Sequence, residues 1–151
     1  MVSAMAHLRR RQSVIVVLLV TPMIVFPGCL YDPGHSHRKE VLAIQAIITI
    51  NKMQVVYRSQ YARYAKSLAE LGPPRGGPPN ASAADLIGSD LASGGRQEYR
   101  FVFTPVPDGY TIHASPVTAS RSGRSFYSDQ TLVIRENEGP EPTTASSREL
   151  K

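Results

Sequence analysis

Residues 38–71 read RKEVLAIQAIITINKMQVVYRSQYARYAKSLAEL and contain neither glycine nor proline. Apolar side chains recur in this stretch at the spacing of an α-helix. They make two adjacent stripes, which are Val41, Ile44, Ile48 and Val55 in one and Ile47, Ile50, Tyr57, Tyr61, Tyr64 and Leu68 in the other. One unbroken helix would be roughly 50 Å long at about 1.5 Å per residue, which is more than a small domain spans. We therefore predict a main helix to about Tyr64 and a further helical turn at residues 66–71, before Gly72 ends it.

The chain after Gly72 is rich in glycine and proline and predicts loops with one short helix. Ser82 can cap that helix, and its apolar edge contains Leu86, Ile87 and Leu91. No phosphate-binding loop signature accompanies the glycines in this region. We therefore expect a connecting loop with a short second helix.

From residue 98 onward the hydrophobic pattern changes to a period of two. Tyr99, Phe101 and Phe103 alternate with polar residues such as Arg100, which predicts a strand with one buried face. Three further short strands are predicted at about 110–115, 125–128 and 132–135, the first of them after an Asp-Gly turn signal. Such a sheet needs a cover on its apolar face. We predict an α+β fold in which the long N-terminal helix packs on a three- to four-stranded antiparallel meander.

The N-terminus has the features of a secretory signal peptide. Three arginines at residues 9–11 precede an apolar run at residues 14–26, which is shorter than the ~20 residues that a membrane span needs. Gly28 and Cys29 follow and resemble the bacterial lipobox, which implies cleavage after Gly28 and lipidation of Cys29. Phe26 and Pro27 depart from that motif. The alternatives are an ordinary signal peptide with an incidental cysteine, or an uncleaved anchor.

Removing the signal peptide changes both the length and the charge of the chain. Residues 1–28 carry three arginines and no acid, so the rest holds 14 basic and 12 acidic residues, a net charge of +2. This near-neutral balance disfavours nucleic acid as a partner. We predict a signal peptide at 1–28, a tether at 29–37, a folded domain at 38–137 and a disordered tail at 138–151. The tail is expected to be disordered because it has almost no large apolar residue.

Short motifs run in a fixed order through residues 41–137. They are Ile48-Thr49-Ile50-Asn51, Gln54, Tyr57, Tyr64-Ala65, Ser67-Leu68-Ala69, Leu71-Gly72, Ala84-Asp85-Leu86-Ile87, Leu91-Ala92-Ser93-Gly94, Tyr99-Arg100-Phe101, Phe126-Tyr127-Ser128-Asp129-Gln130 and Val133-Ile134-Arg135. This order resembles type IV pilin-like and pseudopilin-like globular domains, which pack a long helix on an antiparallel meander. One departure is large: a pilin carries a glutamate at the fifth mature position and then about twenty apolar residues, whereas here Pro33 and a polar segment follow Gly28. The chain thus looks like a pilin-type globular domain behind a lipoprotein-type signal.

No residue pattern in the chain indicates catalysis. No nucleophile elbow is present, and His113 falls on the predicted wet face of a strand. His35 and His37 lack the further ligands that a zinc site needs, so we predict no metal, no cofactor, no small-molecule substrate and no enzymatic activity.

One set of arginines is a candidate for binding an anionic ligand. It contains Arg96, Arg100, Arg121 and Arg124, which would have to converge on one side of the domain. The alternative is a set of solvated surface residues, and the modest net charge favours it.

These observations predict an exported, lipid-anchored, pilin-like envelope protein that acts as a structural or binding module. Its membrane partner would be reached through the lipid on Cys29, and Leu30 after that cysteine resembles signals for the outer membrane of a Gram-negative envelope. A first alternative is a subunit or minor component of a type IV pilus or of a type II secretion pseudopilus, with protein partners in that system. A second alternative is a binder of an anionic polymer such as DNA through the surface arginines.

Overall fold

A computed structural model describes residues 33–96, 98–117, 123–138 and 142–151, with side chains from residue 37 onward except at residue 96. The chain divides into two units, Met1–Leu30 and Tyr31–Lys151, and all described residues belong to the second. The predicted signal peptide, Gly28, Cys29 and Arg121 therefore lie outside the described residues.

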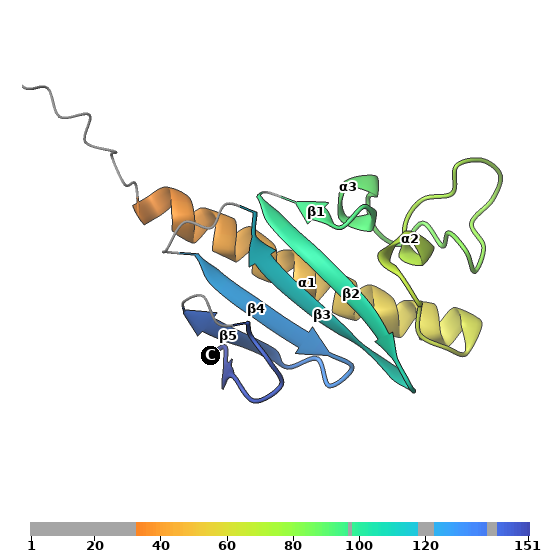
Figure 1. The fold of residues 1–151 in the computed structure, drawn as a ribbon. Helices are drawn as coiled ribbons and strands as arrows, with labels where there is room; N and C mark the ends of the chain where they lie inside the picture. The colour runs from red at the N-terminus through yellow and green to blue at the C-terminus, as the bar shows by residue number, and fades with distance from the viewer. Residues whose placement is uncertain (1–32, 97, 118–122, 139–141) are drawn as a thin grey trace, which may run out of the picture. The chain divides into compact units, whose positions relative to one another are not determined.

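One long helix, α1, lies along one face of an antiparallel sheet (Figure 1). The elements in chain order are α1 (Pro33–Tyr61), α2 (Leu68–Leu71), α3 (Ser89–Ala92), β1 (Gly95–Arg96), β2 (Tyr99–Val106), β3 (Gly109–Pro116), β4 (Arg124–Asp129), β5 (Ile134–Glu138) and β6 (Arg148–Glu149). Every strand pairs with its neighbours in sequence, so the six strands form a meander in the order β1-β2-β3-β4-β5-β6.

Strands β2 and β3 form the longest hairpin of the sheet. They pair over their full lengths, from Tyr99 opposite Pro116 to Val106 opposite Gly109. Only Pro107 and Asp108 remain to make the turn, and Asp108 adopts a left-handed backbone with φ of 54°. Short polar side chains tolerate this conformation better than most residues do, so the aspartate suits the tight connection.

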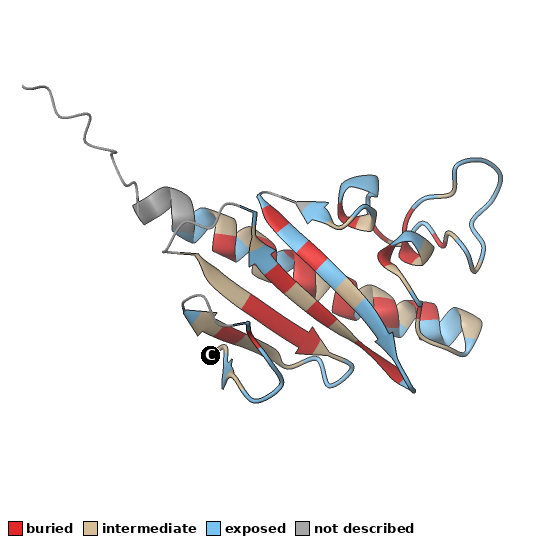
Figure 2. Cartoon of the chain, in the orientation of Figure 1, coloured by how far each residue is buried: buried red, intermediate tan, exposed pale blue. Residues whose placement is uncertain are grey.

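The core lies between α1 and the inner face of the sheet (Figure 2). On α1 the buried seam repeats at intervals of three and four residues and comprises Glu40, Ala43, Ile47, Ile50, Gln54 and Tyr57. The sheet residues of the hydrophobic core are Tyr99, Phe101, Tyr110, Ile112, Ala114 and Phe126, and Ser128 and Glu136 are also buried. The strand phase predicted for Tyr99 and Phe101 is confirmed, since both are buried and Arg100 between them is exposed.

Only one of the two predicted helix stripes is buried. Ile47 and Ile50 are fully buried, whereas Val41 and Val55 of the other stripe are 40% and 49% exposed. The sheet covers a single flank of the helix, so the second stripe remains open to solvent along part of its length.

The predicted fold class is wrong. The sheet has six strands rather than three to four, so it is larger than the predicted meander. Helix α1 also ends at Tyr61, before the predicted end at about Tyr64. The predicted helical turn at residues 66–71 is present as α2, whereas the short helix expected to be capped by Ser82 begins later, at Ser89 after Gly88, as α3. Strands β1 and β6 contain two residues each, which is too short for any alternation to be visible in the sequence.

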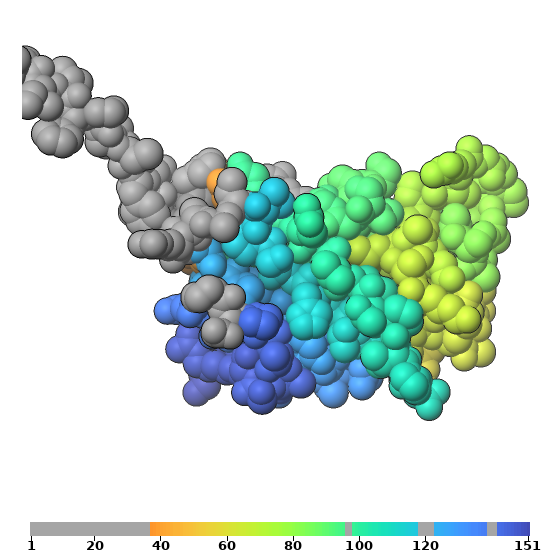
Figure 3. Space-filling view, viewed as in Figure 1, coloured from red at the N-terminus to blue at the C-terminus, as the bar shows by residue number. Residues whose placement is uncertain are grey.

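The expected tether and tail also need correction. Helix α1 begins at Pro33, five residues before Arg38 and therefore within the segment predicted to be a tether. In the tail, β6 pairs with β5, Thr143 is buried, and the Leu150 N–H donates to the Ile134 carbonyl at 2.9 Å. Figure 3 shows the C-terminal residues lying directly against the rest of the sheet surface. Backbone pairing orders this part of the tail although its side chains are mostly polar.

Candidate functional site

The four arginines considered as a candidate anion site do not form a shared site in the described structure. Arg121 and the side chain of Arg96 lie outside the described residues. Arg100 is exposed on the outer face of β2, and Arg124 points from β4 toward α1 on the inner face. The latter two therefore lie on opposite sides of the sheet and cannot contact one ligand group.

Arg124 is committed to ion pairs inside the domain. Its Nε and one terminal nitrogen donate to Glu40 Oε2 at 3.1 and 2.8 Å, and its other terminal nitrogen donates to Glu136 Oε2 at 2.6 Å. Arg148 also pairs with Glu136. The hydrogen bond to Glu40 raises the pKa of Arg124, so the guanidinium stays charged at any pH in normal use. Arg148 also lies 3.6 Å from a carboxylate oxygen of Glu138, so two arginines face three carboxylates and no positive charge is in excess. The cluster ties α1 to β4 and β5.

A second polar network joins the middle of α1 to the sheet. Asn51 Nδ2 donates to Ser128 Oγ at 2.8 Å, and the Tyr110 hydroxyl donates to Asn51 Oδ1 at 3.0 Å. Ser128 Oγ in turn donates to the Val133 carbonyl at 2.9 Å. All three side chains are buried, so these bonds satisfy groups that water cannot reach. This network also fixes the helix in one register on the sheet.

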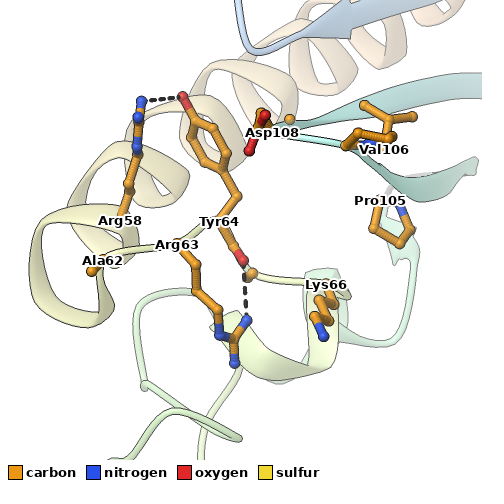
Figure 4. Close-up of a pocket in the computed structure, with 11 residues that line it drawn as sticks. Arg58, Ala62, Arg63, Tyr64, Lys66, Pro105, Val106 and Asp108 are labelled. Carbon is orange, nitrogen blue, oxygen red and sulfur yellow. Dashed lines mark hydrogen bonds between the residues drawn. The ribbon is translucent and has the colours of Figure 1, made fainter.

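The best-formed cavity among those found in the described part has a volume of about 470 Å³ (Figure 4). One wall comes from the last turn of α1 and the loop after it, with Arg58, Arg63, Tyr64 and Lys66. The opposite wall is the β2–β3 turn at residues 105–109. The two walls are about forty residues apart in sequence, and the packing of α1 on the sheet brings them together.

Three cationic side chains line this cavity in different states of pairing. Arg63 donates to the Tyr64 carbonyl at 3.0 Å and to Glu70 Oε2 at 2.8 Å. Arg58 donates one hydrogen bond to the Tyr64 hydroxyl at 3.1 Å, and its guanidinium carbon lies 4.9 Å from the centre of that ring. The Lys66 ammonium has no hydrogen-bond or ion-pair partner within the described parts of the chain. Unused donors of Arg58 and Lys66 therefore remain available at the cavity.

Gln54, a buried residue of α1, and Glu70, a partly exposed residue of α2, hold the loop that carries Lys66. Gln54 Oε1 accepts from the Ala65 N–H at 2.9 Å, and Gln54 Nε2 donates to the Ala65 carbonyl at 3.4 Å. Glu70 Oε2 accepts from the Lys66 N–H and from the Tyr57 hydroxyl, both at 3.0 Å. These contacts hold the backbone at Ala65 and at the Lys66 N–H.

The Glu70 and Tyr57 side chains titrate away from their ordinary ranges. Burial alone would raise the pKa of the Glu70 carboxyl, but hydrogen bonds from Arg63 and from the Lys66 N–H hold it below its usual value. Burial, together with the hydrogen bond to Glu70, raises the pKa of Tyr57 to about 12. At neutral pH the carboxylate is thus charged and the phenol is neutral, which is the pairing that their hydrogen bond requires.

Aromatic packing holds Tyr64, a residue that lines the cavity, against the sheet. Tyr64 meets Tyr110 edge to face with ring centres 5.2 Å apart, and Tyr110 stacks on Phe103 at 5.6 Å. Two lining residues, Ala62 and Asp108, adopt left-handed backbones with φ of 58° and 54°. Asp85, Glu98 and Leu132 adopt the same conformation elsewhere in the described chain, so it does not distinguish the cavity.

The sequence did not reveal this cavity. In the sequence, Arg58 and Arg63 are polar residues of the quoted stretch, and Tyr57, Tyr61 and Tyr64 belong to one of its predicted apolar stripes. No periodic pattern connects the end of a helix to a hairpin turn that follows much later in the chain. The remaining signal was the concentration of Arg58, Arg63 and Lys66 at the end of the quoted stretch.

The residues that the structure describes contain neither a cluster of metal-binding side chains nor a membrane-spanning helix. No group of three or more His, Cys, Asp or Glu there could hold a metal ion. No described helix is long and apolar enough to cross a membrane. His113 lies edge to face against Tyr127 with ring centres 5.1 Å apart, as part of the outer sheet face.

Comparison with known proteins adds no assignment to these observations. No family model matches the chain, and neither curated proteins nor solved structures gave a match. The resemblance to pilin-like domains therefore stays a prediction from the sequence motifs.

Proposed function

We propose that this protein is an exported, lipid-anchored envelope protein that serves as a non-enzymatic binding or structural module. The observation that carries the proposal is the order of features at the N-terminus. Basic residues 9–11, an apolar run at 14–26 and the pair Gly28-Cys29 stand directly before the unit that forms the fold.

The start of α1 supports a close attachment to the membrane. Only residues 30–32 separate Cys29 from Pro33, where α1 begins. An extended chain advances at most about 3.6 Å per residue, so this linker reaches roughly 14 Å. A lipid on Cys29 would keep the domain near the bilayer surface. Since one acyl chain anchors only marginally, stable attachment calls for more than one chain at that cysteine.

The interior of the domain supports a structural or binding role. Its polar groups are used to join elements: the cluster around Arg124 links α1 to β4 and β5, and the Asn51 network links α1 to β3 and β4. Among the described residues, no buried side-chain nitrogen or oxygen lacks a hydrogen-bond partner. Such satisfied networks specify a single packing of the elements.

Metabolic labelling of the full-length chain with a fatty acid tests the anchor. The wild type and Leu30→Ala, a matched control at the neighbouring position, should incorporate label and sediment with membranes. Cys29→Ala should lose the label and shift to the soluble fraction. If Cys29→Ala is labelled as strongly as the wild type, or if the wild type carries no lipid, the proposed anchor is wrong.

A second candidate function is a subunit of a pilus or pseudopilus. The observation that favours it is the open apolar stripe on α1, where Val41 and Val55 are substantially exposed and Ile44 and Ile48 are only partly buried. Immunogold microscopy of sheared surface fractions tests this candidate. Labelled fibres in the wild type that are lost in Val55→Asp would support it, and absence of the protein from every fibre would exclude it.

We do not propose the third candidate, a DNA-type anionic polymer. It needs the predicted arginines to converge, and Arg100 and Arg124 lie on opposite faces of the sheet, with Arg124 already paired to Glu40 and Glu136.

A further inference from the structure

Helix α1 carries an apolar stripe on the side that faces away from the sheet. Val41, Ile48 and Val55 follow one another at intervals of seven residues, which is about two helical turns, so the three side chains lie on one side of the helix. Val41 and Val55 are 40% and 49% exposed, and Ile48 is partly buried. The sheet covers the opposite side of α1 (Figure 1). Apolar side chains along several turns of α1 therefore remain in contact with solvent.

Basic side chains accompany this stripe, and acidic ones do not. Arg38 and Lys52 each lie three residues before a valine of the stripe, so they project from the same side of the helix. Both are exposed and have no hydrogen-bond or ion-pair partner within the described parts of the chain. The one acidic residue in the sequence of 33–61 is Glu40, which is buried and paired with Arg124. The open side of α1 thus combines apolar and cationic groups without an exposed carboxylate.

This combination of groups fits the surface of an anionic lipid bilayer. Helices that lie in the membrane interface place apolar side chains at the boundary between headgroups and acyl chains, and basic side chains at the headgroups. A basic residue near such a surface is attracted by the negative lipids, whereas a carboxylate would be repelled. The open side of α1 has the first kind of charge and lacks the second.

The position of the stripe relative to Cys29 favours a bilayer over a protein partner. Only residues 30–32 separate this cysteine from Pro33, so a lipid on it holds the start of α1 within roughly 14 Å of the membrane. If α1 stood upright on the membrane, Val55 would lie roughly 33 Å beyond Pro33 at about 1.5 Å per residue. If α1 lies flat, the whole stripe reaches the same surface. Only the flat orientation removes the apolar side chains from water.

We propose that the open side of α1 lies on the surface of an anionic bilayer, with the apolar stripe among the headgroups and with Arg38 and Lys52 at the lipid phosphates. This orientation rests on the proposed lipid anchor, because the short tether brings the helix to the membrane. Contact along α1 strengthens an attachment that one acyl chain makes only marginally. It also directs the outer face of the sheet, which includes Arg100 and His113, away from the membrane and toward partners.

Single tryptophans in the full-length chain test this orientation, because the chain has no tryptophan of its own. Val55→Trp places the reporter on the stripe, and Val102→Trp places it on the outer face of β2, where Val102 is 50% exposed and therefore a matched position. Each variant is reconstituted into vesicles of brominated phosphatidylcholine, either alone or mixed with phosphatidylglycerol. In the mixed vesicles, bromine should quench Val55→Trp roughly threefold more strongly than Val102→Trp, because only the first side chain reaches the acyl chains.

Charge reversal tests the cationic part of the surface. In the Val55→Trp background, Lys52→Glu should lower the ratio of docked to undocked helix roughly thirtyfold in the mixed vesicles, and the quenching should fall with it. One basic residue at such a surface is worth about fivefold, and reversal both removes an attraction and adds a repulsion. Arg100→Glu changes the net charge equally on the outer face of β2 and should leave the quenching unchanged. Both positions are exposed, so equal urea midpoints will show that folding is intact.

Attachment and orientation are measured separately. Flotation of the vesicles shows whether the chain is anchored. A chain without a lipid is coupled through Cys29, its single cysteine, to a maleimide-bearing lipid, so failure of the proposed anchor does not prevent the test. Equal quenching of the two tryptophan variants on attached protein overturns the proposed orientation and leaves the anchor standing. The proposal is also overturned if the two charge reversals behave alike. Shielding of Val55→Trp from iodide at rising protein concentration, without vesicles, would overturn it in favour of a second copy of the chain.

Discussion

Replacing Gln54 by leucine tests whether a buried side chain of α1 holds the loop that follows the helix. Gln54 is fully buried, accepts from the Ala65 N–H at 2.9 Å and donates to the Ala65 carbonyl at 3.4 Å. Leucine has a similar volume but cannot pair with either group. An unpaired buried N–H costs about 1–3 kcal/mol, and the longer bond contributes less. The added apolar surface offsets a part, so we expect the free energy of unfolding to fall by about 2 kcal/mol.

Urea unfolding compares this variant with Gln45→Leu, which replaces an exposed glutamine on the same helix. The control should lie within about 0.5 kcal/mol of the wild type. Amide hydrogen exchange gives a second, local measurement, because the Ala65 N–H should lose protection in Gln54→Leu and keep it in Gln45→Leu. Equal midpoints for the two variants, with Ala65 still protected in both, would show that Gln54 does not hold the loop.

Two further predictions concern the core and the acid range. Phe101→Ala should lower the free energy of unfolding by about 3–5 kcal/mol, because Phe101 is only 4% exposed. Arg100→Ala, on the outer face of the same strand, should lower it by less than about 0.5 kcal/mol. Similar urea midpoints for the two variants would mean that the strand phase is misassigned. Burial tends to raise the Glu70 pKa, but hydrogen bonds from Arg63 and the Lys66 N–H hold it below the ordinary value of 4.5. Its stabilising contribution is therefore complete above that value and is lost as pH falls through the folded-state pKa. Stability measured against pH should decline less steeply there in Glu70→Gln, and an unchanged slope would contradict this.

Local features of this protein follow from its sequence alone. The alternation of Tyr99, Arg100 and Phe101 determines which side of β2 is buried, because successive side chains on a strand point to opposite faces. The Asp-Gly pair marks the β2–β3 connection, since aspartate and glycine tolerate the left-handed backbone that a tight turn needs. Each of these is an interaction between near neighbours in the chain, and near neighbours are what a sequence pattern records.

The strand count and the tail depended on pairing between distant segments. Strands β1 and β6 are two residues long and are held by backbone hydrogen bonds to β2 and β5. Backbone groups are the same in every residue type except proline, so their pairing leaves no compositional mark. The polar tail therefore looked disordered, although Thr143 is buried and Leu150 bonds to Ile134.

The tertiary structure alone decided which helix stripe is buried and what the charged residues do. Periodicity predicts burial equally for the stripe that contains Ile47 and for the stripe that contains Val41. The position of the sheet buries the first stripe and leaves the second partly exposed. Arg124 is indistinguishable from Arg100 in sequence, yet one meets Glu40 across 84 residues and the other faces solvent. The cavity at Lys66 likewise arises where a helix end and a hairpin turn meet. Charge pairing and cavities depend on distances in space, which one-dimensional spacing does not contain.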